Sequence, residues 1–241
     1  MIQVTRQGTE SSSSAEALEK LRAQFERQHY FLLPGLLEPG LLALIQRQID
    51  RGEFRERVHE RIDSNKELCL TANAGVGALL FLMNDETLFR IIQDVTRCDR
   101  IRSFEGRVYR VNPGAGHHDA WHNDIGEDRL VGMSINLSRE VYSGGVLQIR
   151  ERESEEVVSE AVNTGAGDAV IFRLAREFQH RITEVEGSNS KSAFAGWFRA
   201  QPDSLSLLKE SYEERDERHL DKISLPSRVR SSGPIHADLS H

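Results

Sequence analysis

The sequence is poor in cysteine, with only Cys69 and Cys98 among 241 residues, in different segments of the chain. A disulfide framework or a zinc site built on thiolates needs several cysteines at characteristic spacings, so neither is expected. Few cysteines are also typical of proteins that work in a reducing compartment. We therefore expect a cytoplasmic protein.

Long apolar runs are absent as well. The first residues, MIQVTRQGTESSSSAEALEK, lack the apolar segment of a signal peptide. No stretch approaches the roughly 20 apolar residues that a membrane-spanning helix needs. The sequence therefore predicts no membrane partner.

Positive charge is in the minority: 31 Lys and Arg residues stand against 38 Asp and Glu residues, which gives a formal net charge of -7. No concentrated basic run appears. Because affinity for nucleic acids depends mainly on clustered Lys and Arg side chains, we expect no nucleic-acid partner.

The first half of the chain has mostly helical patterns. Residues 1–14 are polar and rich in serine, which predicts a disordered tail. Ser13 and Glu16 have the spacing of a capping box and precede apolar residues at helical intervals, which predicts a helix. Residues 30–50 read as strand, turn and helix, and residues 72–95 as two buried helices.

From about residue 101 the pattern changes to short alternating runs separated by Gly, Asn, Asp and Ser clusters. The runs are SFEGRVYRV, RLVGMSINLS, GGVLQIRERE, DAVIFRL and SAFAGWFRA. Strands at this spacing are typical of a sandwich or barrel. We expect one domain over residues 15–200, with a helical part at 15–100 and a strand-rich core at 101–200. A polar helix and tail should follow at 201–241.

Candidate metal ligands lie in the strand-rich half. His122 and Asp124 are two residues apart, so on an extended backbone their side chains leave the same face and can reach one metal ion. His180, on a later strand, offers a third ligand. Two imidazoles and one carboxylate form the facial triad of non-haem Fe(II) oxygenases, which leaves coordination positions open for co-substrate and dioxygen.

A second HxD pattern lies close to the first. The run His117-His118-Asp119 has the same spacing, so spacing alone does not decide between His117 with Asp119 and His122 with Asp124. A polar loop over the site is the alternative interpretation of that run.

The order of motifs resembles the prolyl-hydroxylase-like branch of the Fe(II)- and 2-oxoglutarate-dependent oxygenases. In that family a Pro-Gly turn precedes the metal histidine by a short interval, and here Pro113-Gly114 ends eight residues before His122. SGGVLQI at 143–149 and GAGDAVIF at 165–172 resemble the strand start and the turn that lead to the distal histidine. The resemblance covers about residues 100–200 and favours His122 and Asp124 as ligands.

The resemblance implies a mainly β protein with flanking helices, whose core is a double-stranded β-helix, the cupin-like jelly roll. It implies Fe(II), 2-oxoglutarate and dioxygen, and allows ascorbate as an additional reductant. The activity would be a dioxygenase, a hydroxylase of an unactivated C–H bond that releases succinate and CO2. The substrate would be a small molecule, or an amino-acid side chain, free or in a peptide.

The family also needs a cation for the far carboxylate of 2-oxoglutarate, on the strand after the second histidine. Lys191 lies eleven residues past His180, and the even interval places it on one face with two alanines and Trp197. Relatives more often carry arginine, which binds a carboxylate bidentately. Arg181 and Arg199 are therefore alternative candidates.

Two further residues are candidates for co-substrate contacts. Asn136 lies on the polar face of the run LVGMSINL, where relatives often have a tyrosine, and Tyr109 lies near the place of another pocket tyrosine. Two other functions stay open: a cupin-like metal protein that does not use 2-oxoglutarate, and a non-catalytic binding module with the same fold.

Overall fold

A seven-stranded antiparallel sheet forms the centre of the computed structural model, which describes all residues except 60–64, 118, 127, 163–164 and 203–241. Across this sheet the strands follow the order β3-β11-β7-β14-β6-β5-β4. The strands are β3 (Tyr30–Leu33), β11 (Ala169–Arg173), β7 (Arg129–Asn136), β14 (Lys191–Arg199), β6 (Ser103–Val111), β5 (Asn65–Leu70) and β4 (Phe54–His59). Strands distant in sequence thus become neighbours.

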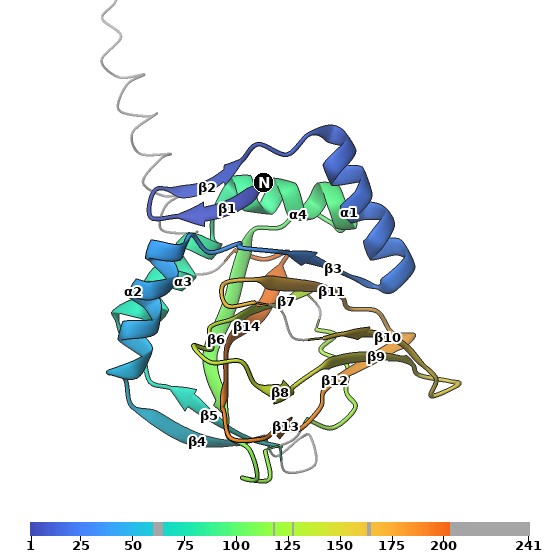
Figure 1. Ribbon diagram of the computed structural model, residues 1–241. Coiled ribbons are helices and arrows are strands. Elements are labelled where there is room, and N and C mark those ends of the chain that lie inside the picture. The colour runs from blue at the N-terminus through green and yellow to red at the C-terminus, as the bar shows by residue number, and fades with distance from the viewer. Residues whose placement is uncertain (60–64, 118, 127, 163–164, 203–241) are drawn as a thin grey trace, which may run out of the picture. The chain divides into compact units, whose positions relative to one another are not determined.

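A smaller sheet lies across from β6 and β14 (Figure 1). It has the order β10-β9-β12 and consists of β10 (Val157–Ala161), β9 (Leu147–Glu151) and β12 (Phe178–Ile182). The short pair β8 (Ser143–Gly144) and β13 (Val185–Glu186) adds to this side. The expected strand-rich architecture is therefore present, as two facing sheets.

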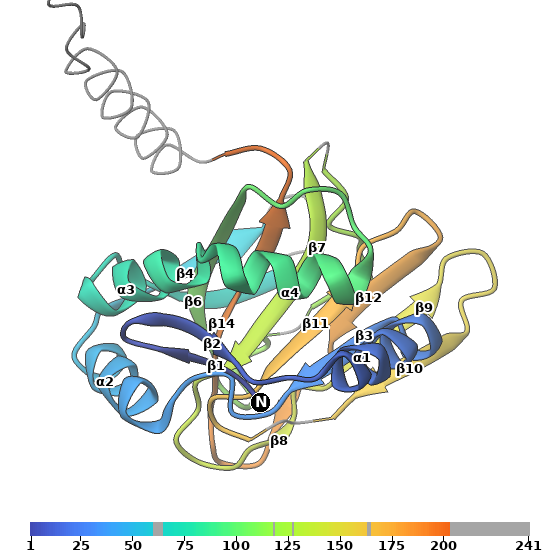
Figure 2. The ribbon, with the colours of Figure 1, turned by 90° about the horizontal axis from the view of Figure 1, so that it is seen from above.

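The helices of the described residues pack against the large sheet, as the view from above shows (Figure 2). They are α1 (Ala15–Gln28), α2 (Pro39–Asp50), α3 (Ala74–Met83) and α4 (Glu86–Thr96). The main hydrophobic core joins their buried faces to one face of the sheet, where Phe104, Phe194 and Phe198 are almost fully buried. Because side chains alternate along a strand, the opposite face of the same strands can carry the polar site residues.

The beginning of the chain differs from the expected tail. It forms the hairpin of β1 (Ile2–Thr5) and β2 (Gly8–Ser11). Ile2 and Val4 are buried in the main core, and the Val4 N–H donates to the Leu36 carbonyl at 2.6 Å. Two alternating apolar residues are too weak a signal in a serine-rich segment, and the core that receives them comes from distant residues.

Other differences are smaller. The N-cap of α1 is Ser14, whose hydroxyl accepts from the Ala17 N–H, rather than Ser13. The two helices expected at residues 72–95 are present as α3 and α4. The part expected to be helical also supplies β4 and β5: β5 pairs with β6, and β4 pairs with β5 at the edge of the sheet. The helix and tail expected at 201–241 lie outside the described residues beyond 202.

By its internal contacts Met1–Asp203 is one compact unit, so the hairpin belongs to the same unit as the jelly-roll strands. Within the described ranges, no helix has both the length and the apolar character needed to cross a membrane.

Candidate metal and co-substrate site

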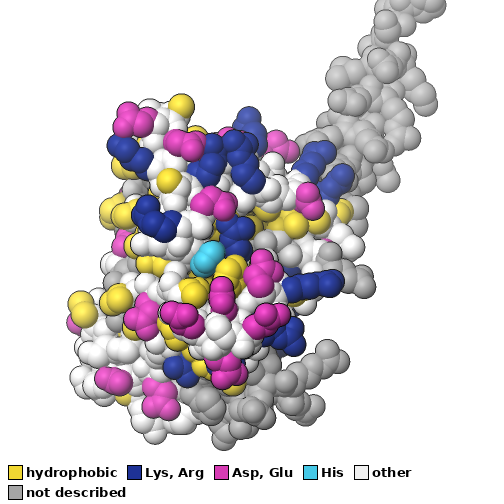
Figure 3. All heavy atoms as spheres, turned by 90° about the vertical axis from the view of Figure 1, so that its right-hand side faces the viewer, with side chains coloured by type: hydrophobic (Ala, Val, Ile, Leu, Met, Phe, Trp, Pro, Cys, Tyr) yellow, Lys and Arg dark blue, Asp and Glu magenta, His cyan; other side chains and the backbone are white. Residues whose placement is uncertain are grey.

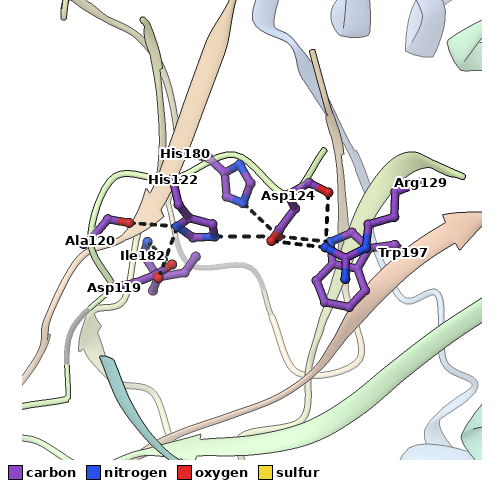
Figure 4. A network of polar contacts seen from close by, with 8 residues as sticks. All are labelled: Asp119, Ala120, His122, Asp124, Arg129, His180, Ile182 and Trp197. Carbon is purple, nitrogen blue, oxygen red and sulfur yellow. Dashed lines mark hydrogen bonds and ion pairs between the residues drawn. The ribbon is translucent and has the colours of Figure 1, made fainter. Parts of the chain in front are cut away.

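Three of the predicted site residues come together between the sheets (Figure 4). His180 lies at the centre of β12, while His122 and Asp124 lie in the connection from β6 to β7. The backbone of His122 pairs with that of His180 through two hydrogen bonds, N–O 3.1 and 2.8 Å. This isolated bridge places the two imidazole rings 4.4 Å apart, and one potential ligand atom from each of the three residues lies within 4.8 Å of the others.

The Asp124 carboxylate completes the cluster. Its Oδ2 lies 3.6 Å from Nε2 of His122 and 3.3 Å from Nε2 of His180. A divalent transition-metal ion binds nitrogen and oxygen ligand atoms at about 2.1 Å, so neighbouring ligand atoms on one ion lie about 3 Å apart. Two imidazoles and one carboxylate with this spacing fit Fe(II) in a facial triad.

The orientation of the His122 ring leaves Nε2, rather than Nδ1, available to bind a metal ion. Its Nδ1 lies 2.8 Å from the carbonyl oxygen of Ala120, which can only accept, so Nδ1 carries the proton. Asp119 also faces Nδ1, at 3.4 Å, and accepts the N–H of Ile182 at 3.1 Å. In the neutral ring, Nε2 therefore presents its lone pair toward Asp124, as metal-binding histidines require.

Burial and close opposite charges shift the pKa values of His122 and Asp124. Burial of His122 opposes its charged form, but the hydrogen bond to Asp124 and the charges of Asp119 and Asp124 raise its pKa to about 9. Burial of Asp124 likewise opposes ionisation, yet hydrogen bonds and charges from His122 and His180 hold its pKa below the usual range. A metal ion would take the place of these protons.

The neighbouring HxD run does not join the cluster. His117 is buried, and its Nδ1 accepts the backbone N–H of Asn112 at 3.1 Å. Asp119 faces Nδ1 of His122, on the opposite side of the ring from Nε2. His118 lies outside the described residues.

Lys191 occupies the first position of β14 and is only 5% exposed. Its Nζ donates to the carbonyl oxygen of Gly145 at 2.9 Å and lies 5.9 Å from the ring of Tyr142. Burial lowers the pKa of Lys191 to about 8, which the charge of Asp119 only partly offsets. A buried ammonium group that is hydrogen bonded to a neutral carbonyl would be stabilised by a bound carboxylate, so Lys191 is suited to bind one.

The register of the large sheet places the other two co-substrate candidates on the same face as Lys191. Ala193, two residues along β14, is paired with Tyr109 on one side and with Asn136 on the other. The Asn136 Oδ1 accepts the N–H of Ser138 at 2.9 Å. Tyr109 is buried, which raises the pKa of its phenol, so it remains a neutral group.

The alternative arginines lie elsewhere. Arg181 follows His180 on β12 and so leaves the opposite face of the strand. Its guanidinium donates to Gln148 at 2.8 Å and lies 4.5 Å above the ring of Trp121. Arg199, at the far end of β14 from Lys191, pairs with Asp128 and Glu105.

Sequence reasoning did not identify two sets of contacts around the triad. The indole N–H of Trp197 donates to Asp124, and Arg129 lies over the Trp197 ring. Phe172 packs on His180 with ring centroids 4.8 Å apart. Gly132 makes room for it, because a Cβ at position 132 would lie 2.2 Å from the Phe172 ring. The one related signal in the sequence was the even interval from Lys191 to Trp197, which places Trp197 on the face of β14 that carries Lys191.

Comparison with known proteins agrees with this geometry. Residues 106–199 match the family model of the 2OG-Fe(II) oxygenase superfamily. A search of curated protein sequences gives no significant match.

Several solved structures share this fold at low sequence identity. An oxidoreductase of the 2OG-Fe(II) oxygenase family from Burkholderia pseudomallei is 14% identical, with a TM-score of 0.57 over 80% of this chain and 93% of that one. A prolyl-4-hydroxylase from Pseudomonas putida is 20% identical, with a TM-score of 0.55 over 76% and 99%. A Trichoplax adhaerens prolyl hydroxylase, in complex with a hypoxia inducible factor peptide fragment, is 16% identical, with a TM-score of 0.57 over 78% and 94%.

These matches confirm the expected double-stranded β-helix with flanking helices, a fold that the two solved prolyl hydroxylases share. The family segment contains His122, Asp124 and His180, and Fe(II), 2-oxoglutarate and dioxygen are the reactants that this family implies. The sequence similarity to the 2OG-Fe(II) oxygenase superfamily is thus carried by residues 106–199.

Proposed function

We propose that this chain is an Fe(II)- and 2-oxoglutarate-dependent dioxygenase that hydroxylates an unactivated C–H bond, with iron held by His122, Asp124 and His180. The observation that carries the proposal is the convergence of three suitable ligand atoms within 4.8 Å. Lys191 is a buried cation, and the Asp119 carboxylate that faces His122 also acts on its charge.

With iron, 2-oxoglutarate and dioxygen bound, the site would supply oxidative decarboxylation to succinate and CO2, coupled to oxidation of the substrate. The protein's own part is placement and exclusion of water. Lys191 would bind the far carboxylate of 2-oxoglutarate, and Ala193 and Ala195, on the same face of β14, have side chains small enough to admit it. Asn136 and Tyr109, which flank Ala193, would contact the same co-substrate.

The partner is a substrate that carries the C–H bond, and we propose a small molecule or an amino-acid side chain, free or in a peptide. The peptide bound by the Trichoplax adhaerens enzyme is a property of that protein. On the face shown in Figure 3, acidic and basic side chains are interspersed around a histidine at the surface. This mixture supports a partner other than nucleic acid, for which a basic surface is typical.

We also propose a cytoplasmic location. Cys69 and Cys98 are free thiols in the structure, and neither is paired in a disulfide. Unpaired cysteines are typical of a reducing compartment.

An anaerobic titration with Fe(II) and then 2-oxoglutarate tests the proposal, because chelation of the metal by the keto acid gives a visible charge-transfer band. Wild type should develop the band, His122→Ala and His180→Ala should not, and Lys191→Ala should need much more 2-oxoglutarate. His117→Ala is the matched control and should keep the band.

Each alternative has its own outcome in this experiment. A band that survives in His122→Ala but not in His117→Ala would move the metal site to the neighbouring run. No band at all, with metal still bound, would indicate a cupin-like protein that does not use 2-oxoglutarate. A band without succinate release over a broad substrate panel would favour a non-catalytic module.

A further inference from the structure

Two side chains outside the triad hold both oxygens of the Asp124 carboxylate (Figure 4). The indole Nε1 of Trp197 donates to Oδ2 at 3.0 Å. Nη1 of Arg129 lies 3.5 Å from Oδ1 and donates to the Asp124 backbone carbonyl at 3.2 Å. Asp124 is therefore held through its main chain and through each carboxylate oxygen.

Trp197 and Arg129 also contact each other. The Arg129 guanidinium carbon lies 3.6 Å from the centroid of the Trp197 ring, which is close stacking for a cation over an indole. The two residues come from neighbouring strands, since Trp197 is in β14 and Arg129 begins β7. This stack gives the indole one orientation, with its single N–H directed at Asp124.

The two oxygens have different surroundings. Oδ2 faces the histidine nitrogens at 3.6 and 3.3 Å, whereas Oδ1 faces the Arg129 guanidinium. A free aspartate can rotate about its terminal torsion and can bind a metal through one oxygen or both. With Oδ1 attracted to Arg129, only Oδ2 is directed toward the position between the histidines.

We propose that Trp197 and Arg129 are positioning residues that hold Asp124 as a ligand through Oδ2 alone. This inference rests on the proposed function, because it assumes a metal at His122, Asp124 and His180. Ligation through one oxygen keeps the further coordination positions of a facial triad available to co-substrate and dioxygen. Neither residue needs to touch the metal or the substrate to have this effect.

Metal affinity without turnover tests this role. Under anaerobic conditions, Mn(II) binding can be followed through the loss of the EPR signal of free Mn(II). Trp197→Phe removes the N–H but keeps an aromatic ring, and Arg129→Met removes the charge but keeps apolar length. Loss of a group that orients a metal ligand typically weakens metal binding 10- to 100-fold, and we expect Trp197→Phe to fall in this range.

The chain offers matched controls. Trp121→Phe and Arg150→Met change a second stack of the same kind, in which Arg150 lies 4.6 Å above Trp121 without a contact to the triad carboxylate. Both should bind Mn(II) as wild type does. Arg129→Lys, which restores a cation, should recover part of the affinity lost in Arg129→Met. This recovery would not be expected if Arg129 only filled space.

The outcomes separate this inference from the proposed function. If wild type binds Mn(II), His122→Ala does not, and Trp197→Phe binds as tightly as wild type, the positioning role is overturned while the metal site stands. If wild type itself does not bind Mn(II), both are overturned. A loss in Trp197→Phe with an unchanged unfolding midpoint of the metal-free protein supports the inference.

Discussion

Lys191 is a cation in surroundings that disfavour its charge. Its ammonium is buried and hydrogen bonded to the neutral carbonyl of Gly145, and burial lowers its pKa to about 8. A buried charge without a close counter-ion costs stability, and natural proteins keep such groups mainly where function needs them. The carboxylate of 2-oxoglutarate would supply a counter-charge beside this ammonium.

Replacement of Lys191 by methionine should therefore separate stability from binding. A lysine pKa lowered from 10.5 to about 8 means that the buried charge destabilises the folded protein by roughly 3 kcal/mol. Removal of the lysine relieves this cost but also loses a hydrogen bond worth about 1 kcal/mol. We expect Lys191→Met to stabilise the metal-free protein by about 1–3 kcal/mol in urea unfolding, and to bind 2-oxoglutarate more than tenfold more weakly. A variant that is destabilised and still binds 2-oxoglutarate normally would contradict this role.

The same lysine predicts how co-substrate binding depends on pH. Only the charged ammonium attracts the carboxylate, and with a pKa of about 8 the charged fraction falls from roughly 0.9 at pH 7 to roughly 0.1 at pH 9. The apparent affinity for 2-oxoglutarate should fall about tenfold over this range, as measured by anaerobic charge-transfer titration. Lys191→Arg should show a much flatter profile, because arginine stays charged. Equal pH profiles for the two proteins would argue against Lys191.

At the scale of elements, three adjacent strands determine the surroundings of His180. Gly132 in β7 is paired with Phe172 in β11 and with Trp197 in β14. Because position 132 has no side chain, the Phe172 ring can lie across it and pack on His180. The glycine thus acts on the candidate metal site through an aromatic neighbour.

Gly132→Ala should disturb this arrangement, because its Cβ would lie 2.2 Å from the Phe172 ring. Overpacking of this kind costs about 1–3 kcal/mol, and we also expect weaker Mn(II) binding as Phe172 shifts against His180. Gly77→Ala is the control with the opposite sign. Gly77 lies in α3, and outside the backbone of its own helix nothing lies within 4 Å of the added Cβ, so this change should stabilise the protein by up to about 1 kcal/mol. Unfolding in urea measures both changes.

At the scale of the whole molecule, the first residues are part of the folded unit. The hairpin of β1 and β2 inserts Ile2 and Val4 into the core that also joins the helices to the large sheet. Val4 is completely buried, and its backbone pairs with Leu36 and Glu38. Loss of these residues should therefore affect the entire unit from Met1 to Asp203.

Val4→Ala tests whether the hairpin stabilises the whole protein. Removal of two buried methyl groups leaves a cavity and should cost about 2 kcal/mol in the free energy of unfolding. Gln7→Ala, in the exposed turn of the same hairpin, should change it by less than about 0.5 kcal/mol. Equal stability of the two variants would indicate that residues 1–12 behave as the tail that their composition suggests.

Local patterns in the sequence were informative where the physical cause is local. Alternation of apolar and polar residues predicted the strand-rich core, and helical periodicity with buried apolar faces predicted α3 and α4. A two-residue interval places His122 and Asp124 on one side of an extended segment whatever the rest of the chain does. The same rule put Lys191 and Trp197 on one face of β14, which the register of the sheet bears out.

Contacts between distant segments required the tertiary structure. The backbone bridge between His122 and His180, 58 positions apart, brings their imidazoles together. His117 instead accepts a hydrogen bond from the backbone N–H of Asn112. No interval encodes the stack of Arg129 on Trp197 or the burial of Lys191, because each arises from strands paired across the sheet. By itself, then, the sequence determined which residue types could form the site. The packing of the two sheets decided which of them meet, because only packing brings side chains distant along the chain within a few ångströms.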